Sequence, residues 1–202
     1  MKLSATEFVT LDGVYQGPGG PDEDRRGGFE RGGWQAPFGD AQTDEFITAV
    51  YSGMDGMMLG RRTFDIWEGY WPLHDGGDPV SHGINVLPKY VPTTTRTQTT
   101  WQNTHLIRDD LEGKVRELKA QPGRYLLLQG SGVLLKWLLE RDLVDELNLL
   151  IYPVVLGEGF RLFPEKGQSH RLEMLNSTTT PSGVMIQTYR PVGRASFGTV
   201  GE

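Results

Sequence analysis

The chain has 202 residues, of which 37% are hydrophobic and 23% are charged, and its formal net charge is −6 at pH 7. This length fits one domain, and the composition is typical of a globular protein, which excludes a disordered chain. The acidic balance disfavours broad nucleic-acid binding, which depends on clustered lysine and arginine, and no run reaches the roughly 18 apolar residues of a membrane span.

Cysteine is absent, and the four histidines are scattered along the chain. The sequence therefore provides no disulfide framework and no thiolate metal site, and its histidines lack the i, i+3 or i, i+4 spacing of paired ligands. The first ten residues lack the apolar core of a secretory signal. We expect a cytoplasmic protein without a metal cofactor.

A first strand is expected over residues 2–11, ahead of the turn-forming pair Asp12-Gly13. The glycine- and proline-rich loop at 13–43 is far longer than the usual connection of about 4 to 6 residues. Loops of this length are often lids, although the composition fits a disordered surface insertion equally well. The aromatic residues of the loop, Trp34 among them, favour an ordered flap.

Two short apolar runs are each followed at once by glycine and then by a helical pattern. Residues 56–59 lead into a helix over 61–67, and residues 125–129 lead into a helix over 133–141. Each run is too short for a helix, and its apolar character is typical of a buried strand. The sequence therefore predicts two strand-turn-helix units.

Amphipathic periodicity marks two further helices, one from residue 43 to about 53 and one that Asp109 caps. Residues 70–88 are expected to be irregular. Short apolar segments mark the remaining strands, at 90–91, 104–107, 144–156, 170–179 and 184–190.

The last two of these strands are joined so tightly that they must be antiparallel. The predicted fold class is therefore α/β, with a central mixed, mostly parallel sheet, helices on both faces and an antiparallel C-terminal hairpin. We expect a single domain over residues 1–192, followed by a flexible tail at 193–202.

The first glycine turn, Gly60-Arg61-Arg62-Thr63, has the chemistry of a phosphate site. Glycine lets the backbone turn sharply, and the start of the following helix offers unpaired N–H groups with a partial positive charge. Two guanidinium groups and a hydroxyl add hydrogen-bond donors for phosphate oxygens. The alternative is an ordinary turn whose arginines are solvated.

The second glycine turn, Gly130-Ser131-Gly132, carries a weaker pattern. A G-x-G triplet also occurs in plain packing turns, and Leu135 stands where a full dinucleotide-binding fingerprint has its third glycine. Taken alone, this turn does not identify a binding site.

Taken together, the short motifs of the chain resemble the dihydrofolate reductase-like superfamily. They are Phe8-Val9-Thr10-Leu11-Asp12-Gly13, Leu59 to Phe64, Pro88-Lys89-Tyr90-Val91, Gly130 to Gly132 with Leu134, Leu143 to Leu147, and Pro153 to Gly159 with Leu162-Phe163. They occur in register from residue 8 to residue 163 and so cover most of the chain. The resembling branch contains the reductase domain of the riboflavin-biosynthesis enzyme, the C-terminal domain of the deaminase-reductase.

The resemblance implies a three-layer fold that binds NADPH at the carboxyl ends of the sheet strands. In that family the motif matched by Gly60 to Thr63 contacts the pyrophosphate and the 2′-phosphate region. The turn matched by Gly130, Ser131, Gly132 and Val133 wraps the pyrophosphate. Both implied roles agree with the anion chemistry of the two turns.

The strand matched by Tyr90-Val91 usually continues into a serine and an arginine near the adenosine 2′-phosphate. Here the corresponding run is Pro92-Thr93-Thr94. Thr93 keeps a hydroxyl, whereas the arginine is missing. The expected cofactor is therefore NADPH, with NADH left open.

Hydride transfer to a C=N or C=O bond creates negative charge on the accepting heteroatom, so a proton donor is useful nearby. Asp44 and Asp12 are the candidate catalytic acids. Asp44 lies where dihydrofolate reductases place their substrate-binding acid, although an acid near a helix N-terminus is also favoured for stability. Asp12 is explained nearly as well by a turn-forming Asp-Gly pair.

Two further residues are candidates for substrate binding. Trp34 provides a ring that can stack on a planar heterocycle, although aromatic residues of a loop more often pack in a core or lid. Gln129 stands where the riboflavin branch typically has a glutamate that touches the ribose of the substrate. This departure counts against the true riboflavin precursor.

The sequence therefore predicts an NAD(P)H-dependent reductase that acts on a small planar heterocycle, a pterin or a compound like 5-amino-6-(5-phosphoribosylamino)uracil. By family analogy we expect a homodimer, with neither nucleic acid nor membrane as a partner. The alternative is a non-catalytic nucleotide- or ligand-binding protein on the same scaffold.

Overall fold

The structure is a computed structural model and describes residues 1–163 and 165–201. Its strands are β1 (Lys2–Thr10), β2 (Gly56–Met58), β3 (Lys89–Pro92), β4 (Thr104–Ile107), β5 (Tyr125–Gln129), β6 (Glu146–Tyr152), β7 (Leu172–Thr179) and β8 (Met185–Pro191). Its α-helices are α1 (Ala41–Gly53), α2 (Arg61–Glu68), α3 (Pro79–Val86), α4 (Leu111–Ala120) and α5 (Gly132–Leu139). No helix among the described residues is long and apolar enough to cross a membrane.

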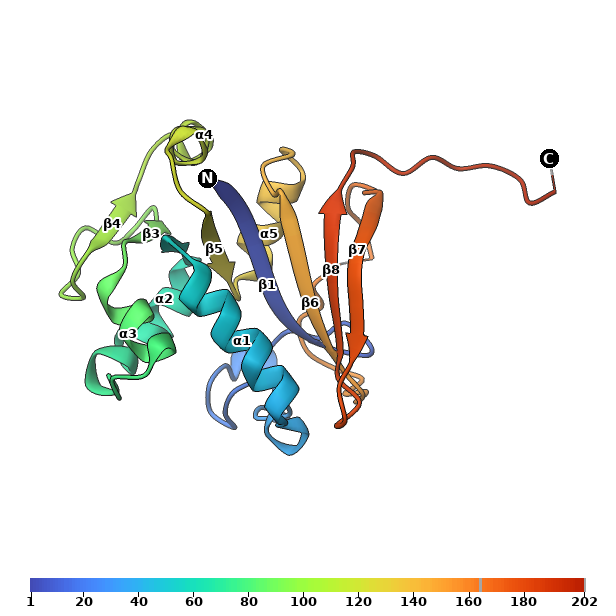
Figure 1. The fold of residues 1–202 in the computed structure, drawn as a ribbon, viewed down its shortest axis with the longest axis horizontal. Coiled ribbons are helices and arrows are strands. Elements are labelled where there is room, and N and C mark those ends of the chain that lie inside the picture. The colour runs from blue at the N-terminus through green and yellow to red at the C-terminus, as the bar shows by residue number, and fades with distance from the viewer. Residues whose placement is uncertain (164, 202) are drawn as a thin grey trace.

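All eight strands form one sheet in the order β4-β3-β2-β5-β1-β6-β8-β7 (Figure 1). The pairs from β4 to β6 are parallel, whereas β8 lies antiparallel to both β6 and β7. The central strand β5 is almost entirely apolar, as a parallel strand covered on both faces requires. The mixed, mostly parallel sheet with a C-terminal hairpin is therefore confirmed.

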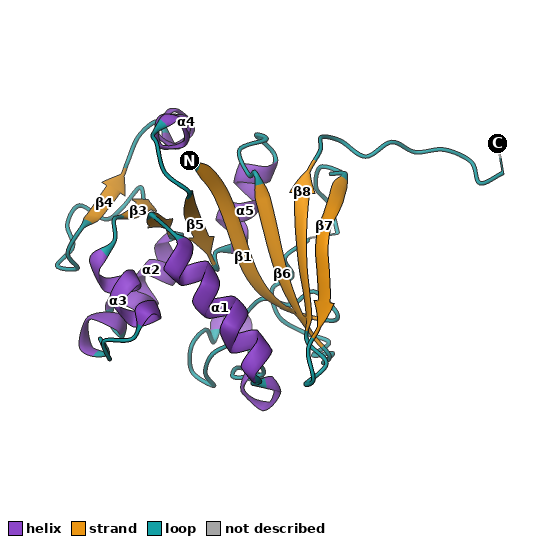
Figure 2. Cartoon of the chain, viewed as in Figure 1, coloured by secondary structure: helices purple, strands orange, loops and turns teal. Residues whose placement is uncertain are grey.

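Helices cover both faces of the sheet (Figure 2). On one face, Leu135 and Leu138 of α5 and Val115 of α4 pack in one core cluster with strands β1, β5 and β6. On the other face, helices α1, α2 and α3 pack in a second cluster around Leu59 and Leu127. Buried apolar surface on both faces fixes the sheet as the middle of three layers.

The loop between β1 and α1 packs onto the body of the protein. Val14, Phe29 and Trp34 are buried in a third core cluster with β6 and β8. The indole Nε1 of Trp34 donates to the Gln16 carbonyl at 2.8 Å, and Gln35 Nε2 donates to the Tyr152 hydroxyl at 2.8 Å. These contacts pack the loop against β6 and β8.

The structure corrects the expectation that residues 70–88 are irregular, because α3 lies within them. Asp78 caps this helix by accepting the N–H groups of Val80 and Ser81, and Pro79 occupies its first turn. The helix contains glycine, serine and asparagine, which weaken a propensity-based prediction. Its cap and its packing against the second core cluster decide the conformation.

Other expected boundaries also shift, among them the end of the helix expected over 133–141, which is α5 and ends at Leu139. Helix α1 begins at Ala41, since Asp40 accepts the N–H of Thr43 and so provides the cap. Asp110 rather than Asp109 caps α4. Strand β6 ends at Tyr152 because the following residue is a proline, which has no N–H for the ladder.

Candidate functional site

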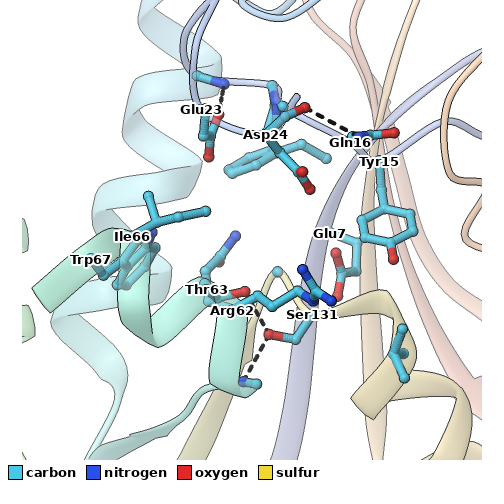
Figure 3. Close-up of a pocket in the computed structure, with 18 of the residues that line it drawn as sticks. Glu7, Tyr15, Gln16, Glu23, Asp24, Arg62, Thr63, Ile66, Trp67 and Ser131 are labelled. Carbon is cyan, nitrogen blue, oxygen red and sulfur yellow. Dashed lines mark hydrogen bonds between the residues drawn. The ribbon is translucent and has the colours of Figure 1, made fainter. Parts of the chain in front are cut away.

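A cavity of about 960 Å³ lies at the carboxyl ends of β1 and β5, between α2, α5 and the long loop (Figure 3). Open α/β sheets bind ligands at this edge, and the volume lies at the upper end of the usual range of about 300 to 1,000 Å³. Its walls come from β1 (Glu7, Phe8), the loop (Tyr15 to Asp24, Arg26, Gln35), α2 with its preceding turn and the segment after it (Gly60 to Thr63, Ile66, Trp67, Tyr70, Trp71), Pro92, the end of β5 with its turn (Gln129 to Ser131), and α5 (Val133, Leu134, Trp137).

The structure brings the two glycine turns together at one wall of the cavity. The backbone N–H of Gly60 donates to Ser131 Oγ at 2.8 Å, and the hydroxyls of Ser131 and Thr63 are hydrogen-bonded at 2.7 Å (Figure 3). A Cβ at position 60 would lie only 2.6 Å from Ser131 Oγ. Glycine at this position is thus required by the close approach of the second turn.

The second turn has an unusual backbone. Gly130 and Ser131 both have positive φ, 56° and 77°, and this left-handed conformation is costly for a serine. A Cβ on Gly132 would meet the Tyr15 ring at 2.8 Å. The second turn therefore packs between the long loop and the start of α2. This packing keeps the starts of α2 and α5 side by side.

The two arginines after Gly60 have different environments. Arg61 Nε donates to both carboxylate oxygens of Asp65, at 2.9 and 2.8 Å, and its Nη1 donates to Thr95. Arg62 is exposed and makes no hydrogen bond or ion pair to any residue that the structure describes. Both line the cavity, but only Arg62 has a guanidinium group available for an anion.

Thr93 and Thr94 lie beside the cavity without lining it, whereas the neighbouring Pro92 does. Thr93 is buried, and its hydroxyl accepts the backbone N–H of Arg96 at 3.0 Å, so it shapes the turn. Sequence reasoning missed Arg96, which reaches α2 and pairs with Asp65. Arg96 therefore places an arginine beside α2 from a position three residues after Thr93, but its guanidinium group is already paired with Asp65.

The polar side of the loop wall is built from acidic residues. Glu23 Oε2 accepts the N–H groups of Gly19 at 2.6 Å and Gly20 at 3.3 Å, which holds the glycine-rich turn closed. Burial raises the pKa of Glu23. Asp24 forms an ion pair with Arg26. The loop therefore presents carboxylates opposite the arginines of α2.

Glu7 is the unexpected feature of the cavity. Its side chain is 1% exposed, yet it lines the cavity, and its Oε1 has no hydrogen-bond partner among the described residues. Burial raises the pKa of Glu7 to about 8, which favours the protonated form at neutral pH. Sequence reasoning missed this residue, although a lone carboxyl within the buried part of β1, whose other charged residue is Lys2 at its exposed start, is an available indication.

Of the two predicted substrate-binding residues, Gln129 lines the cavity and Trp34 does not. Gln129 is 3% exposed, and its Oε1 also lacks a partner among the described residues. Trp34 packs edge-on against Tyr152 with ring centroids 5.3 Å apart, beneath the loop. The cavity thus contains two buried side-chain oxygens, from Glu7 and Gln129, that the described residues leave unsatisfied.

The two predicted catalytic acids lie outside the set of described residues that line the cavity. Asp44 is exposed on the first turn of α1. Asp12 accepts hydrogen bonds from Thr10 Oγ1 at 2.6 Å and from the Gly157 N–H at 2.9 Å, and it pairs with Arg161. Slight burial raises the pKa of Asp12, but the hydrogen bonds that it accepts outweigh this and lower it to about 2.

Comparison with known proteins identifies one family that matches most of the chain. The family described as the RibD C-terminal domain matches residues 1–186. The protein YyaP of Bacillus subtilis (strain 168) is 32% identical over 185 residues, which are 90% of each chain.

Two solved structures share the fold at lower sequence identity. A riboflavin biosynthesis protein from Shewanella sp. PV-4 is 22% identical, with a TM-score of 0.73 over 95% of this chain and 99% of its own. Dihydrofolate reductase from Enterococcus faecalis, complexed with NADP(H), is 16% identical, with a TM-score of 0.58 over 94% of this chain and 96% of its own. These likenesses confirm the expected dihydrofolate reductase-like fold. The chain belongs to the family of the RibD C-terminal domain.

Proposed function

We propose that the protein is an NAD(P)H-dependent reductase that transfers a hydride to a small planar heterocycle, a pterin or a compound like 5-amino-6-(5-phosphoribosylamino)uracil. The observation that carries the proposal is the hydrogen bond between Gly60 N and Ser131 Oγ. It joins two helix starts at the wall of one large cavity, and such starts favour phosphate groups. The reductase-type fold of the family supports the same function.

The residues at this wall suit a dinucleotide. Neither α2 nor α5 has a side-chain cap within the part of the chain described here, so their first-turn N–H groups are open to an anion. In our proposal Gly60, Thr63 and the turn from Gly130 to Val133 hold the pyrophosphate, while Arg62 binds a phosphate. The bound cofactor supplies the hydride.

The preference for NADPH over NADH is part of the proposal. It is supported by Arg62 at the cavity and by the hydroxyl group of Thr94 nearby. Arg96 lies in the same region, although its guanidinium is already paired with Asp65. Because the positive charges of both Arg61 and Arg96 are already paired with Asp65, we expect a moderate rather than an absolute preference.

Tryptophan fluorescence tests this proposal directly, because Trp67, Trp71 and Trp137 line the cavity. NADPH should quench the emission with saturation, and NADH should do so at higher concentration. Free tryptophan amide, titrated in parallel, corrects for light absorbed by the cofactor. Absence of saturable quenching by either cofactor at millimolar concentration would contradict the proposal.

Turnover then separates a reductase from a binding protein. The oxidation of bound NADPH is followed with 7,8-dihydrofolate, other pterins and aminopyrimidine ribose or ribitol phosphates as acceptors. Oxidation that depends on one acceptor supports the reductase. Saturable NADPH binding without oxidation across the panel favours the non-catalytic alternative.

A further inference from the structure

The carboxyl group of Glu7 is buried at the centre of the fold, at a place where nothing in the described structure satisfies it. Strand β1 lies between β5 and β6, and Glu7 pairs with Leu149 of β6 in the ladder. Figure 3 shows the side chain directed into the cavity beside Tyr15, across from Thr63, Ile66 and Trp67. Its Oε1 has no partner among the described residues.

An unsatisfied buried carboxyl costs folding free energy, so such groups are found mainly where they serve a ligand or a reaction. Asn148, on the neighbouring strand, shows the contrast. Its side chain is equally buried, but its Nδ2 donates to Ser4 Oγ and Thr6 Oγ1, at 3.2 and 3.3 Å. The interior can therefore satisfy the hydrogen bonds of a polar side chain at this depth. The side chain of Glu7, whose Oε1 has no partner among the described residues, lines the cavity instead.

We propose that the carboxyl group of Glu7 touches the substrate and delivers the proton that hydride transfer to a C=N bond requires. This inference rests on the proposed reductase function and assigns to Glu7 the acid role for which the sequence predicted Asp44 or Asp12. Among the carboxyl groups that line the cavity, Glu7 is the one buried in a sheet strand. Of the acidic residues of the loop wall, Glu23 accepts backbone N–H groups, while Asp24 pairs with Arg26 and Asp22 with Arg25.

The surroundings of Glu7 favour a neutral acid. Two of the ionisable groups that interact with Glu7 are the phenols of Tyr15, from the loop, and Tyr51, from α1, both of which are neutral at pH 7 and have a pKa raised mainly by burial. The charged residues Arg26, Asp24 and Arg62 line the same cavity and act on the pKa of Tyr15, and none of them forms an ion pair with Glu7 within the described chain. No described residue forms an ion pair with Glu7, so desolvation dominates, and its raised pKa of about 8 leaves the proton in place at neutral pH.

The chemical step balances with this acid. As hydride adds to the carbon of the C=N bond, the π electron pair moves to nitrogen, and that nitrogen takes the proton of Glu7. A C–H and an N–H bond form, the O–H bond of Glu7 breaks, the substrate is reduced and the nicotinamide donor of the proposed function is oxidised. Glu7 is left as a carboxylate and regains its proton from solvent. A general acid placed in this way contributes about 10²- to 10⁴-fold to the rate.

The first test concerns the proton itself and needs no substrate. The folding equilibrium constants of wild type and Glu7→Gln are measured by urea unfolding from pH 5 to pH 9. Because the folded pKa of about 8 exceeds the unfolded value of about 4.5, the wild-type constant should fall relative to the variant by about tenfold per pH unit up to pH 8. A constant ratio across this range would show an ionised Glu7, which cannot donate a proton, and would overturn the proposal.

The second test measures NADPH oxidation with 7,8-dihydrofolate and an aminopyrimidine ribose phosphate as probes. Glu7→Gln should lower kcat by about 100-fold or more and change the KM for NADPH by less than about threefold. Wild-type kcat should fall as pH rises above about 8, because the acid loses its proton there. Tyr15→Phe is the matched control, since it removes the neighbouring hydroxyl, and it should keep the wild-type pH profile.

The outcomes separate the two proposals. If the wild-type protein fails to bind NADPH, the reductase function falls, and the Glu7 step falls with it. If NADPH binds but Glu7→Gln keeps wild-type kcat, or the wild-type protein reduces neither probe, the Glu7 proposal is overturned while cofactor binding stands. Should Glu7→Gln not fold, the pH profile of the wild type decides, because a kcat independent of pH between 7 and 9.5 would exclude an acid with a pKa of about 8.

Discussion

Ser131 accepts the backbone N–H of Gly60 at 2.8 Å, across 71 positions of the chain. This one hydrogen bond fixes the starts of α2 and α5 relative to each other, and both helix starts face the cavity. The serine hydroxyl also bonds Thr63. Because it is engaged with the neighbouring turn, it does not cap its own helix, and the N-terminus of α5 has no side-chain cap from the described residues.

The contact between the two turns predicts a strong coupling between their residues. Gly60→Ala should destabilise the protein by about 1 to 3 kcal/mol, because the new Cβ would lie 2.6 Å from Ser131 Oγ and 2.7 Å from Ser131 Cβ. Ser131→Gly removes both atoms and suits the positive φ of this position. The double variant should therefore be more stable than Gly60→Ala alone, as measured by urea unfolding. Simple addition of the two single effects would argue against the close approach.

Arg62 should matter more than Arg61 for dinucleotide binding. Arg62→Ala should weaken NADPH binding by about 1.5 to 3 kcal/mol, the scale of a hydrogen bond to a charged group. Arg61→Ala should have a smaller effect, because its guanidinium already contacts Asp65 and Thr95. Fluorescence titrations at two salt concentrations measure both, and the Arg62 effect should shrink at high salt. Equal losses for the two variants would contradict the assignment.

Asp12 should stabilise the protein in a pH-dependent way. Its folded pKa of about 2 lies below the unfolded value of 3.8, so the stabilisation is complete above about pH 4 and is lost as pH falls towards 2. The slope in that window should not exceed about 1.4 kcal/mol per pH unit. Acid unfolding of wild type and Asp12→Asn measures this contribution, which the variant should lack.

The same Asp12→Asn variant tests the catalytic role that the sequence predicted for this residue. If Asp12 acts only through the Gly157 N–H and Arg161, kcat at pH 7 should stay near the wild-type value. A large loss of kcat in a folded variant would instead support the sequence-based prediction.

Lys89 should be essential for stability although it is not among the described residues that line the cavity. Its buried Nζ donates to the carbonyls of Ile84, Asn85 and Leu87, at 3.0, 2.9 and 2.9 Å, and so closes the C-terminal end of α3. Lys89→Met should cost about 2 to 4 kcal/mol, because it leaves buried carbonyls without donors. Urea unfolding measures the loss.

A surface lysine provides the matched control. Lys114 pairs with Glu117 on the exposed side of α4, and an exposed pair of this kind contributes little to stability. Lys114→Met should change the unfolding free energy by less than about 1 kcal/mol. A comparable loss at both lysines would show that burial is not the cause.

The sequence by itself determined the two strand-turn-helix units and the mixed sheet. Apolar runs, glycine turns and the tight C-terminal hairpin are local features, and local chemistry is enough to predict them. The sequence-based prediction failed at α3, because this helix depends on the Asp78 cap and on packing rather than on a strong periodic pattern. The family resemblance, carried by several motifs in order, supplied the fold.

Only the tertiary structure decided which of these residues meet. The strand order places β5 between β2 and β1, and this order brings Ser131 to Gly60 and buries Glu7 beside the cavity. The sequence also could not distinguish Arg61, which is paired, from Arg62, which is free among the described residues. Such distinctions depend on contacts between distant segments, and these exist only once the crossover connections have fixed the order of the parallel strands.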